Sequence, residues 1–338
     1  MLHEFLSVEL PIVQAPMAGV QGSELAIAVS NAGGLGSLPC AMLSLDQMRS
    51  ELSKIRSGTR NPFNVNFFCH TPPKPDAARE TAWRAALSKY YEEFRIDANA
   101  IPPAPGRSPF SEEAADLLEE FKPPVVSFHF GLPSTALMAR VKALGCTTLA
   151  TATTVYEALW LEAHGADAVI AQGFEAGGHY GTFLTRDIMA PVGTFALLPQ
   201  VVKSVKLPVI AAGGISDAQC VKAALSLGAT AAQVGTSYLL CPEATTSAVH
   251  RGALKSADSR HTTMTRIFSG RPARGIVNRL IRELGPMSDL APEFPLAASA
   301  LTQLRAKAES IGDGGFSPLW CGQKCHRLLR ASRRGPDT

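Results

Sequence analysis

The chain has 338 residues, of which 46% are hydrophobic and 18% are charged, so it holds enough apolar material for one large domain with a buried core. Its net charge is only +3, and much of the basic excess lies at the end of the chain, where it indicates a short solvated terminus or, alternatively, a contact to nucleic acid. No basic face interleaved with aromatic residues occurs elsewhere, so nucleic-acid binding has little support. No stretch resembles a signal peptide or a bilayer-spanning segment, and the seven cysteines form no CxxC pair, so the sequence indicates a cytoplasmic protein without a zinc site or a disulfide framework.

Short apolar runs alternate with helical patterns along most of the chain. Strands are predicted at residues 11–17, 34–39, 61–68, 124–130, 147–152, 168–172, 208–213 and 231–236. Helices are predicted at residues 23–31, 44–57, 134–144, 154–164, 194–205 and 217–227, most of them opening with Ser, Thr or Asp as the N-cap. Because apolar strands that alternate with helices form parallel sheets covered on both faces, eight such units predict a closed (β/α)8 TIM barrel.

Two segments interrupt this alternation. Residues 71–123 are rich in proline and charge and carry helical patterns at 76–95 and 111–120, which predicts an elaborated loop after the third strand. Residues 241–311 are helical in pattern without a further strand, which predicts a smaller helical substrate lobe. The expected organisation is a barrel formed by residues 1–240 and 312–326, a lobe formed by 241–311 and a disordered tail at 327–338.

The last two predicted strands end in glycines at the carboxyl edge of the barrel, where the active sites of such barrels lie. Gly213 and Gly214 follow the seventh strand and open a helix, and Gly235 with Thr236 repeats the arrangement after the eighth. Backbone amides at such turns bind a phosphate well, above all beside a helix N-terminus. The sequence therefore predicts a phosphate site here; glycines that only permit tight turns are the alternative.

The sixth predicted strand opens into a loop that contains Gly177, Gly178 and His179. Glycines let the backbone approach a flat or phosphorylated ligand closely, because they have no Cβ. His179 is the one side chain of the loop that exchanges a proton near neutral pH. A turn histidine without a chemical role is the alternative interpretation. Glu175, in the same loop, is interpreted as a loop-stabilising carboxylate.

Neutral side chains lie at the remaining strand ends. Asn66 and Gln172 are amides on different strands, suited to bind a heteroaromatic ring such as an isoalloxazine, or else satisfied within the barrel core. Pro16 and Met17 would offer such a ring a flat, mostly apolar surface. His129 is interpreted as a histidine of the barrel wall, with a contact to substrate or flavin as the alternative. Neither a lysine nor a pair of acids lies at a strand end, so we expect no Schiff base and no divalent metal.

Five segments in combination resemble the nitronate monooxygenases, a family formerly called 2-nitropropane dioxygenases. They are Pro11-Ile-Val-Gln-Ala-Pro-Met-Ala-Gly19, Asn64-Val-Asn-Phe-Phe68, Ala171-Gln-Gly-Phe-Glu-Ala-Gly-Gly-His179, Ala212-Gly-Gly-Ile215 and Gln233-Val-Gly-Thr236. The resemblance implies an FMN-dependent barrel enzyme that oxidises an alkyl nitronate, such as propionate 3-nitronate, with O2 to a carbonyl compound and nitrite.

The resemblance also implies roles for individual residues. His179 becomes the catalytic base, which removes the α-proton when a neutral nitroalkane is bound. The flavin contacts expected from the resemblance and from the strand ends are Pro16, Met17, Asn66, Gln172, Gly177, Gly178, Gly213, Gly214, Gln233, Val234, Gly235 and Thr236. The expected partners are a small nitronate and O2, without nucleic acid, membrane or metal.

Three other functions stay open at this point. A flavin reductase on the same barrel would use NAD(P)H to reduce an enoyl thioester or a quinone. A barrel similar to IMP dehydrogenase needs a cysteine in the loop after the sixth strand, and residues 174–182 contain none. A flavin- or phosphate-binding protein without catalysis would not need an imidazole beside its ligand.

Overall fold

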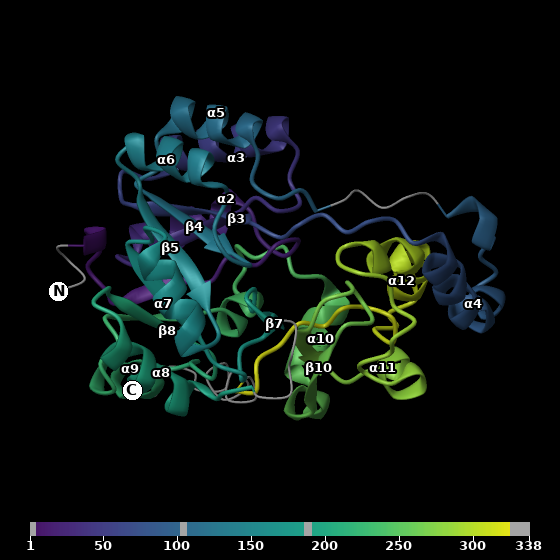
Figure 1. The fold of residues 1–338 in the computed structure, drawn as a ribbon. Helices are drawn as coiled ribbons and strands as arrows, with labels where there is room; N and C mark the ends of the chain where they lie inside the picture. Colours follow the sequence, from purple (N-terminus) through teal and green to yellow (C-terminus); the bar gives the residue numbers. More distant parts are fainter. Residues whose placement is uncertain (1–4, 102–106, 186–190, 325–338) are drawn as a thin grey trace. The chain divides into compact units, whose positions relative to one another are not determined.

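The computed structural model describes residues 5–101, 107–185 and 191–324 (Figure 1). The chain divides into two compact units, and each is described by itself. Among the described residues, the first unit comprises 5–71, 108–176, 181–185 and 191–246, and the second comprises 72–101, 107, 177–180 and 247–324. No helix within the described ranges combines the length and the apolarity that a bilayer crossing requires.

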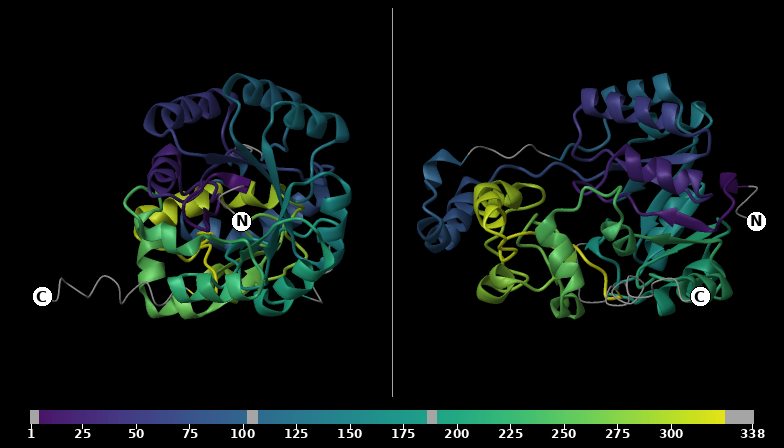
Figure 2. Two further views of the ribbon diagram at one scale, coloured as in Figure 1. Left: turned by 90° about the vertical axis from the view of Figure 1, so that its left-hand side faces the viewer. Right: turned by 180° about the vertical axis from the view of Figure 1, so that it is seen from behind.

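The first unit is a ring of eight parallel strands (Figures 1 and 2). Their hydrogen-bonded order is β1-β9-β8-β6-β5-β4-β3-β2, and a parallel bridge between Val13 and Leu35 joins the two ends of this order. The strands are β1 (Ile12–Gln14), β2 (Gly36–Pro39), β3 (Phe63–Phe68), β4 (Val125–His129), β5 (Thr147–Ala152), β6 (Ala168–Gln172), β8 (Val209–Ala212) and β9 (Ala231–Val234). The predicted TIM barrel is confirmed.

Helices follow the barrel strands at the predicted places, and the predicted capping residues explain where several begin. The side chains of Ser44, Ser134, Thr154 and Asp217 each accept a hydrogen bond from the backbone amide three residues later. The helices of this unit are α2 (Ser23–Asn31), α3 (Leu45–Gly58), α5 (Glu112–Phe121), α6 (Thr135–Ala143), α7 (Val155–Ala163), α8 (Thr194–Ser204) and α9 (Ala218–Ser226). In Figure 1, α3, α5 and α6 lie together along one side of β3 and β4.

Alternating residues of the strands divide between two buried clusters. Ile170 and Ala231 belong to a cluster made almost entirely of strand residues, whereas Val169 packs in the cluster that the surrounding helices share. Side chains two residues apart on a strand point to the same face. Gln172 and Gln233 therefore lie on the inner face of the barrel, at the carboxyl ends of their strands.

The second unit contains a small antiparallel sheet, which corrects the prediction that residues 241–311 are helical throughout. Its order is β10-β11-β7, formed by β10 (Thr262–Thr265), β11 (Ala273–Ile276) and β7 (Gly178–His179). The strands escaped prediction because their sequences, Gly-His, Thr-Thr-Met-Thr and Ala-Arg-Gly-Ile, lack the apolar run that marks the equally short strands of the barrel. The helical elements of this unit are α4 (Ala77–Glu93), η1 (Ala98–Ala100), α10 (Ala248–Lys255), η3 (Ala257–Arg260), α11 (Arg279–Leu284), η4 (Leu296–Leu301) and α12 (Thr302–Ser310).

The composition of the second unit differs from the expected domain boundaries at two places. Helix α4 belongs to it rather than to a barrel loop, because Trp83 and Leu87 are buried in one cluster with Leu304 and Phe316. Residues 312–324 also belong to it, since Trp320 pairs with Gly275 of β11 instead of returning to the barrel. The expected disordered tail, 327–338, lies outside the described residues.

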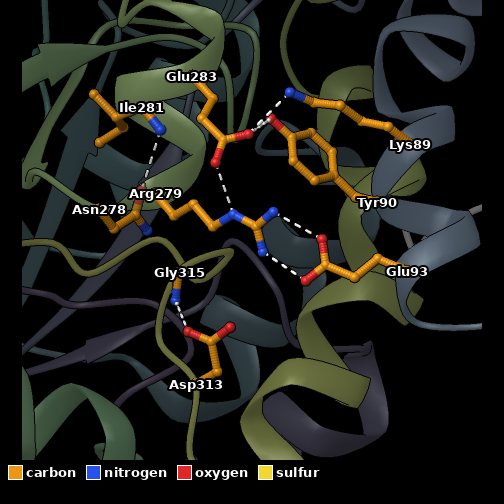
Figure 3. Close-up of polar contacts among 9 residues, drawn as sticks. All are labelled: Lys89, Tyr90, Glu93, Asn278, Arg279, Ile281, Glu283, Asp313 and Gly315. Carbon is orange, nitrogen blue, oxygen red and sulfur yellow. Dashed lines mark hydrogen bonds and ion pairs between the residues drawn. The ribbon is translucent and has the colours of Figure 1, made fainter.

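A cluster of ion pairs joins α4 to α11 within the second unit (Figure 3). The guanidinium of Arg279 donates to both carboxylate oxygens of Glu93, at 2.6 and 2.7 Å, and to Glu283 at 2.8 Å. Lys89 and the hydroxyl of Tyr90 donate to the second oxygen of Glu283, each at 2.9 Å. These partners, Arg279 first, lower the pKa of Glu283 to about 2.

This depressed pKa predicts acid sensitivity of the second unit. A carboxylate whose pKa is lower in the folded than in the unfolded state stabilises the fold above its ordinary pKa, and this stabilisation is lost as the pH falls toward about 2. We expect the melting temperature of the wild type to fall more steeply below about pH 4.5 than that of Glu283→Gln. The control is Glu80→Gln on α4, because Glu80 makes no ion pair among the described residues. Parallel pH profiles of Glu283→Gln and the wild type would contradict this expectation.

Candidate functional site

The turn after β8 requires glycine at two consecutive positions. Gly213 and Gly214 have φ values of +114° and +68°, which L-residues with side chains rarely adopt. A Cβ at Gly213 would also lie 2.7 Å from the hydroxyl oxygen of Thr194 and 3.1 Å from the carbonyl oxygen of Gly173. A Cβ at Gly214 would meet nothing closer than 3.6 Å, so its conformation alone demands glycine. Helix α9 begins four residues after Gly214, with Asp217 as its N-cap.

Two buried polar atoms near the ends of β8 and β9 have no hydrogen-bond partner among the described residues. They are the hydroxyl oxygen of Ser216 and the carbonyl oxygen of Gln233. Leaving a buried polar atom without a partner costs about 1–3 kcal/mol. A ligand that pairs with these two oxygens would remove this cost.

The end of β9 lies beside the segment that follows β1. A Cβ on Gly235 would stand 3.3 Å from the Cβ of Ala15 and 3.8 Å from the sulfur of Met17. Val234 is the register partner of Gln14, and Thr236 opens the 3-10 helix η2 (Thr236–Leu240). The structure therefore brings Met17 together with Gly235 at the end of β9.

Asn66 and its neighbours form a buried polar network across β2, β3 and β4. The amide nitrogen of Asn66 donates to the hydroxyl and to the carbonyl oxygen of Ser127, at 2.9 and 3.2 Å. The amide nitrogen of Asn64 donates to the same hydroxyl at 2.9 Å and to that of Ser37 at 3.0 Å. The carbonyl oxygen of Asn64 is buried without a partner among the described residues. Asn64 and Ser127 were not selected from the sequence, although polar residues at alternate positions of apolar strands were a usable signal.

The loop after β6 is held by side chains of the barrel. The carbonyl oxygen of Gln172 accepts from the backbone amide of Gly181 at 2.7 Å. Glu175 accepts from the backbone amide and the hydroxyl of Thr194, at 2.8 and 2.9 Å, at the start of α8. Glu175 is thus a loop-stabilising carboxylate, as interpreted. Sequence reasoning missed the buried Glu157. Its carboxylate accepts from the amide of Phe183 at 2.6 Å and from four further donors, which belong to Thr153, Thr182 and Leu184.

His179 belongs to the second unit, where it forms β7 with Gly178. Its Nε2 lies 2.9 Å from the hydroxyl oxygen of Ser269, a residue buried to 1% exposure. Its ring centroid lies 5.3 Å from that of Phe294 and 5.6 Å from that of Trp320. The backbone of His179 pairs with Ala273 of β11. A strand on one side and a hydroxyl with two aromatic rings on the other therefore fix the orientation of the imidazole.

Glycine occupies the two positions before His179 for different structural reasons. A Cβ at Gly177 would lie 2.5 Å from the backbone nitrogen of Gly322, so close chain packing explains this glycine without any ligand. Gly178 has a φ of +74° and open space around its Cβ position. His129, the other strand-end imidazole, lies 3.1 Å from the hydroxyl of Thr151, consistent with a histidine of the barrel wall. No group of three or more metal-ligating side chains occurs in the described part of the chain.

Comparison with known proteins adds to this geometry. The family model described as nitronate monooxygenase matches residues 1–332. The nitronate monooxygenase of Paraburkholderia phytofirmans is 44% identical over 330 residues, 95% of this chain and 88% of that protein. The nitronate monooxygenase of Pseudomonas aeruginosa is 42% identical over 325 residues, covering 94% and 91%. A solved nitroalkane oxidase from Streptomyces ansochromogenes superposes with a TM-score of 0.87 and 40% identity, covering 97% of this chain and 95% of that one.

Proposed function

The chain belongs to the nitronate monooxygenase family, and on this premise we propose that it is an FMN-dependent enzyme that oxidises alkyl nitronates with O2 to a carbonyl compound and nitrite. Propionate 3-nitronate is one such substrate. The reaction is supported by similarity over nearly the whole chain. The cofactor is supported above all by the partnerless buried oxygens of Ser216 and Gln233 near the ends of β8 and β9.

The residues of the first unit suit FMN. The left-handed turn at Gly213 and Gly214 and the start of α9 would hold the phosphate through backbone amides. Asn66 and Gln172 would bind the polar edge of the ring. Their amides already have protein partners that fix how they point. FMN, when bound, supplies the electron-accepting chemistry, while the protein positions it.

His179 would move the proton. A neutral imidazole that donates its Nε2 hydrogen to Ser269 carries its lone pair on Nδ1. Nδ1 is then the atom that takes the α-proton from a neutral nitroalkane, and the resulting imidazolium would hold the anionic nitro group. The contacts of the ring with Phe294 and Trp320 would exclude water on its flanks.

Because the carbonyl oxygen of Gln233 has no partner, we expect its removal to have opposite effects on the stability of the protein and on its affinity for the cofactor. Gln233→Met keeps the length of the side chain and removes a buried oxygen that the protein alone leaves unsatisfied. We expect the cofactor-free variant to melt at the wild-type temperature or higher, whereas its affinity for FMN falls about 10-fold. The control is Gln200→Met on the exposed face of α8. A variant that is less stable and binds FMN as the wild type does would contradict this role.

Two measurements test the proposed function. The purified protein should show a flavin absorbance spectrum after loading with FMN, and it should release nitrite from preformed alkyl nitronates in the presence of O2.

Mixing the loaded protein with NADH without oxygen tests the reductase alternative, because rapid bleaching of the flavin would favour it. A protein that takes up no FMN from an excess would overturn the proposal.

A further inference from the structure

Arg107 is a partly buried cation in the second unit. The central carbon of its guanidinium lies 5.5 Å from the ring centroid of Phe294. Among the described residues no carboxylate pairs with it. An arginine in such a position normally pairs with an anion, because its planar donors match a carboxylate or a phosphate.

The other charge that acts on Arg107 is also positive. Burial lowers the pKa of Arg107, and the nearby guanidinium of Arg305 lowers it further. Arg305 has its own counter-ion, since its Nε donates to Glu309 at 2.7 Å. A buried charge without a partner is costly, and that cost is removed when an anion binds.

Phe294 connects Arg107 to the proposed base. One ring contacts both groups, since its centroid lies 5.3 Å from that of the His179 imidazole and 5.5 Å from the Arg107 guanidinium carbon. The separation of imidazole and guanidinium can be no larger than these two distances together. The segment that carries Phe294 is also tightly packed, because a Cβ at Gly270 would lie 2.2 Å from the backbone of Pro292. Imidazole and guanidinium therefore both contact the Phe294 ring within one unit.

We propose that Arg107 binds the carboxylate of a nitronate substrate whose nitro end meets His179. This inference rests on the proposed function. Arg107 would act as a specificity-determining residue. Its planar fork accommodates a carboxylate with two parallel hydrogen bonds, and the Phe294 face behind it keeps the guanidinium from swinging away.

The test compares two substrates of equal length. Nitrite release is measured with propionate 3-nitronate and with propyl 1-nitronate, which has a methyl group where the first has its carboxylate. Arg107→Met keeps the apolar contact with Phe294 and removes the charge. We expect it to raise the KM for propionate 3-nitronate about 10- to 100-fold, the usual range for losing a charged hydrogen-bond partner, and to leave the KM for propyl 1-nitronate nearly unchanged. The KM of Arg107→Lys for propionate 3-nitronate should lie between the values of the wild type and of Arg107→Met.

A binding measurement separates this inference from the proposed function. Succinate has the charges and spacing of propionate 3-nitronate but does not react, and its Kd for the FMN-loaded protein can be measured by calorimetry. Arg107→Met should weaken succinate binding by the same factor as the KM, whereas the control Arg282→Gln, at an exposed arginine in the last turn of α11, should not. Equal effects on both nitronates, or unchanged succinate binding, would overturn the role of Arg107. Absence of nitrite from both substrates with the wild type would instead overturn the proposed function.

Discussion

Replacing His179 by asparagine should lower turnover of a neutral nitroalkane at neutral pH by about 10²- to 10⁴-fold, the usual contribution of a positioned general base. Asparagine retains a polar side chain of similar width but cannot accept the α-proton. A preformed nitronate has already lost that proton, so its turnover should fall much less. The ratio of the two rates, measured by nitrite release at equal FMN content, isolates proton removal from binding and folding.

A second imidazole offers a matched control for this experiment. His129 also lies at a strand end, but its Nδ1 contacts Thr151 and its ring packs at 4.5 Å from that of Phe130. His129→Asn should leave the ratio of the two substrates at its wild-type value, even where both rates drop through loss of packing. If His179→Asn kept full turnover of the neutral nitroalkane, another group would be the base.

The barrel was predictable because its determinants are local. Each strand is an apolar run, each helix has its own period, and caps such as Ser44 and Asp217 lie within three residues of the amides that they bind. The small sheet of the second unit was not predictable in this way. His179 pairs with Ala273, more than ninety residues later, and the two-residue β7 has no period of its own.

The candidate site was predictable in part for a related reason. The glycines of the β8 turn can be recognised from sequence, because two consecutive glycines after an apolar run have few other uses. The contacts that orient the chemistry are long-range, as in the pairing of His179 with Ser269 and the stacking of Arg107 on Phe294. In the sequence Arg107 follows a proline-rich stretch, a position that is typical of an exposed charge. Its lack of a counter-ion becomes visible only once the second unit is folded.

Introducing a carboxylate at Gly235 should abolish FMN binding at ordinary concentrations. The φ of Gly235 is −120°, outside the left-handed region that favours glycine, and a Cβ there would need only a small shift of Ala15. Gly235→Asp is therefore compatible with the fold, but it places a negative charge where the phosphate is proposed to bind. Two unit charges 4 Å apart near a protein surface repel by about 4 kcal/mol, which corresponds to a loss of affinity of about 1,000-fold.

Two companion variants separate charge from size and from position in this experiment. Gly235→Ala adds the Cβ without the charge and should weaken FMN binding only slightly. Gly252→Asp adds the same charge in α10, where a Cβ meets no atom within 4 Å, and should leave the affinity unchanged. The Kd is measured by quenching of flavin fluorescence, and the melting temperature of the cofactor-free proteins confirms folding. If folded Gly235→Asp bound FMN with the wild-type affinity, the proposed phosphate position at the end of β9 would be wrong, because no arrangement of a dianion beside Gly235 tolerates a carboxylate there.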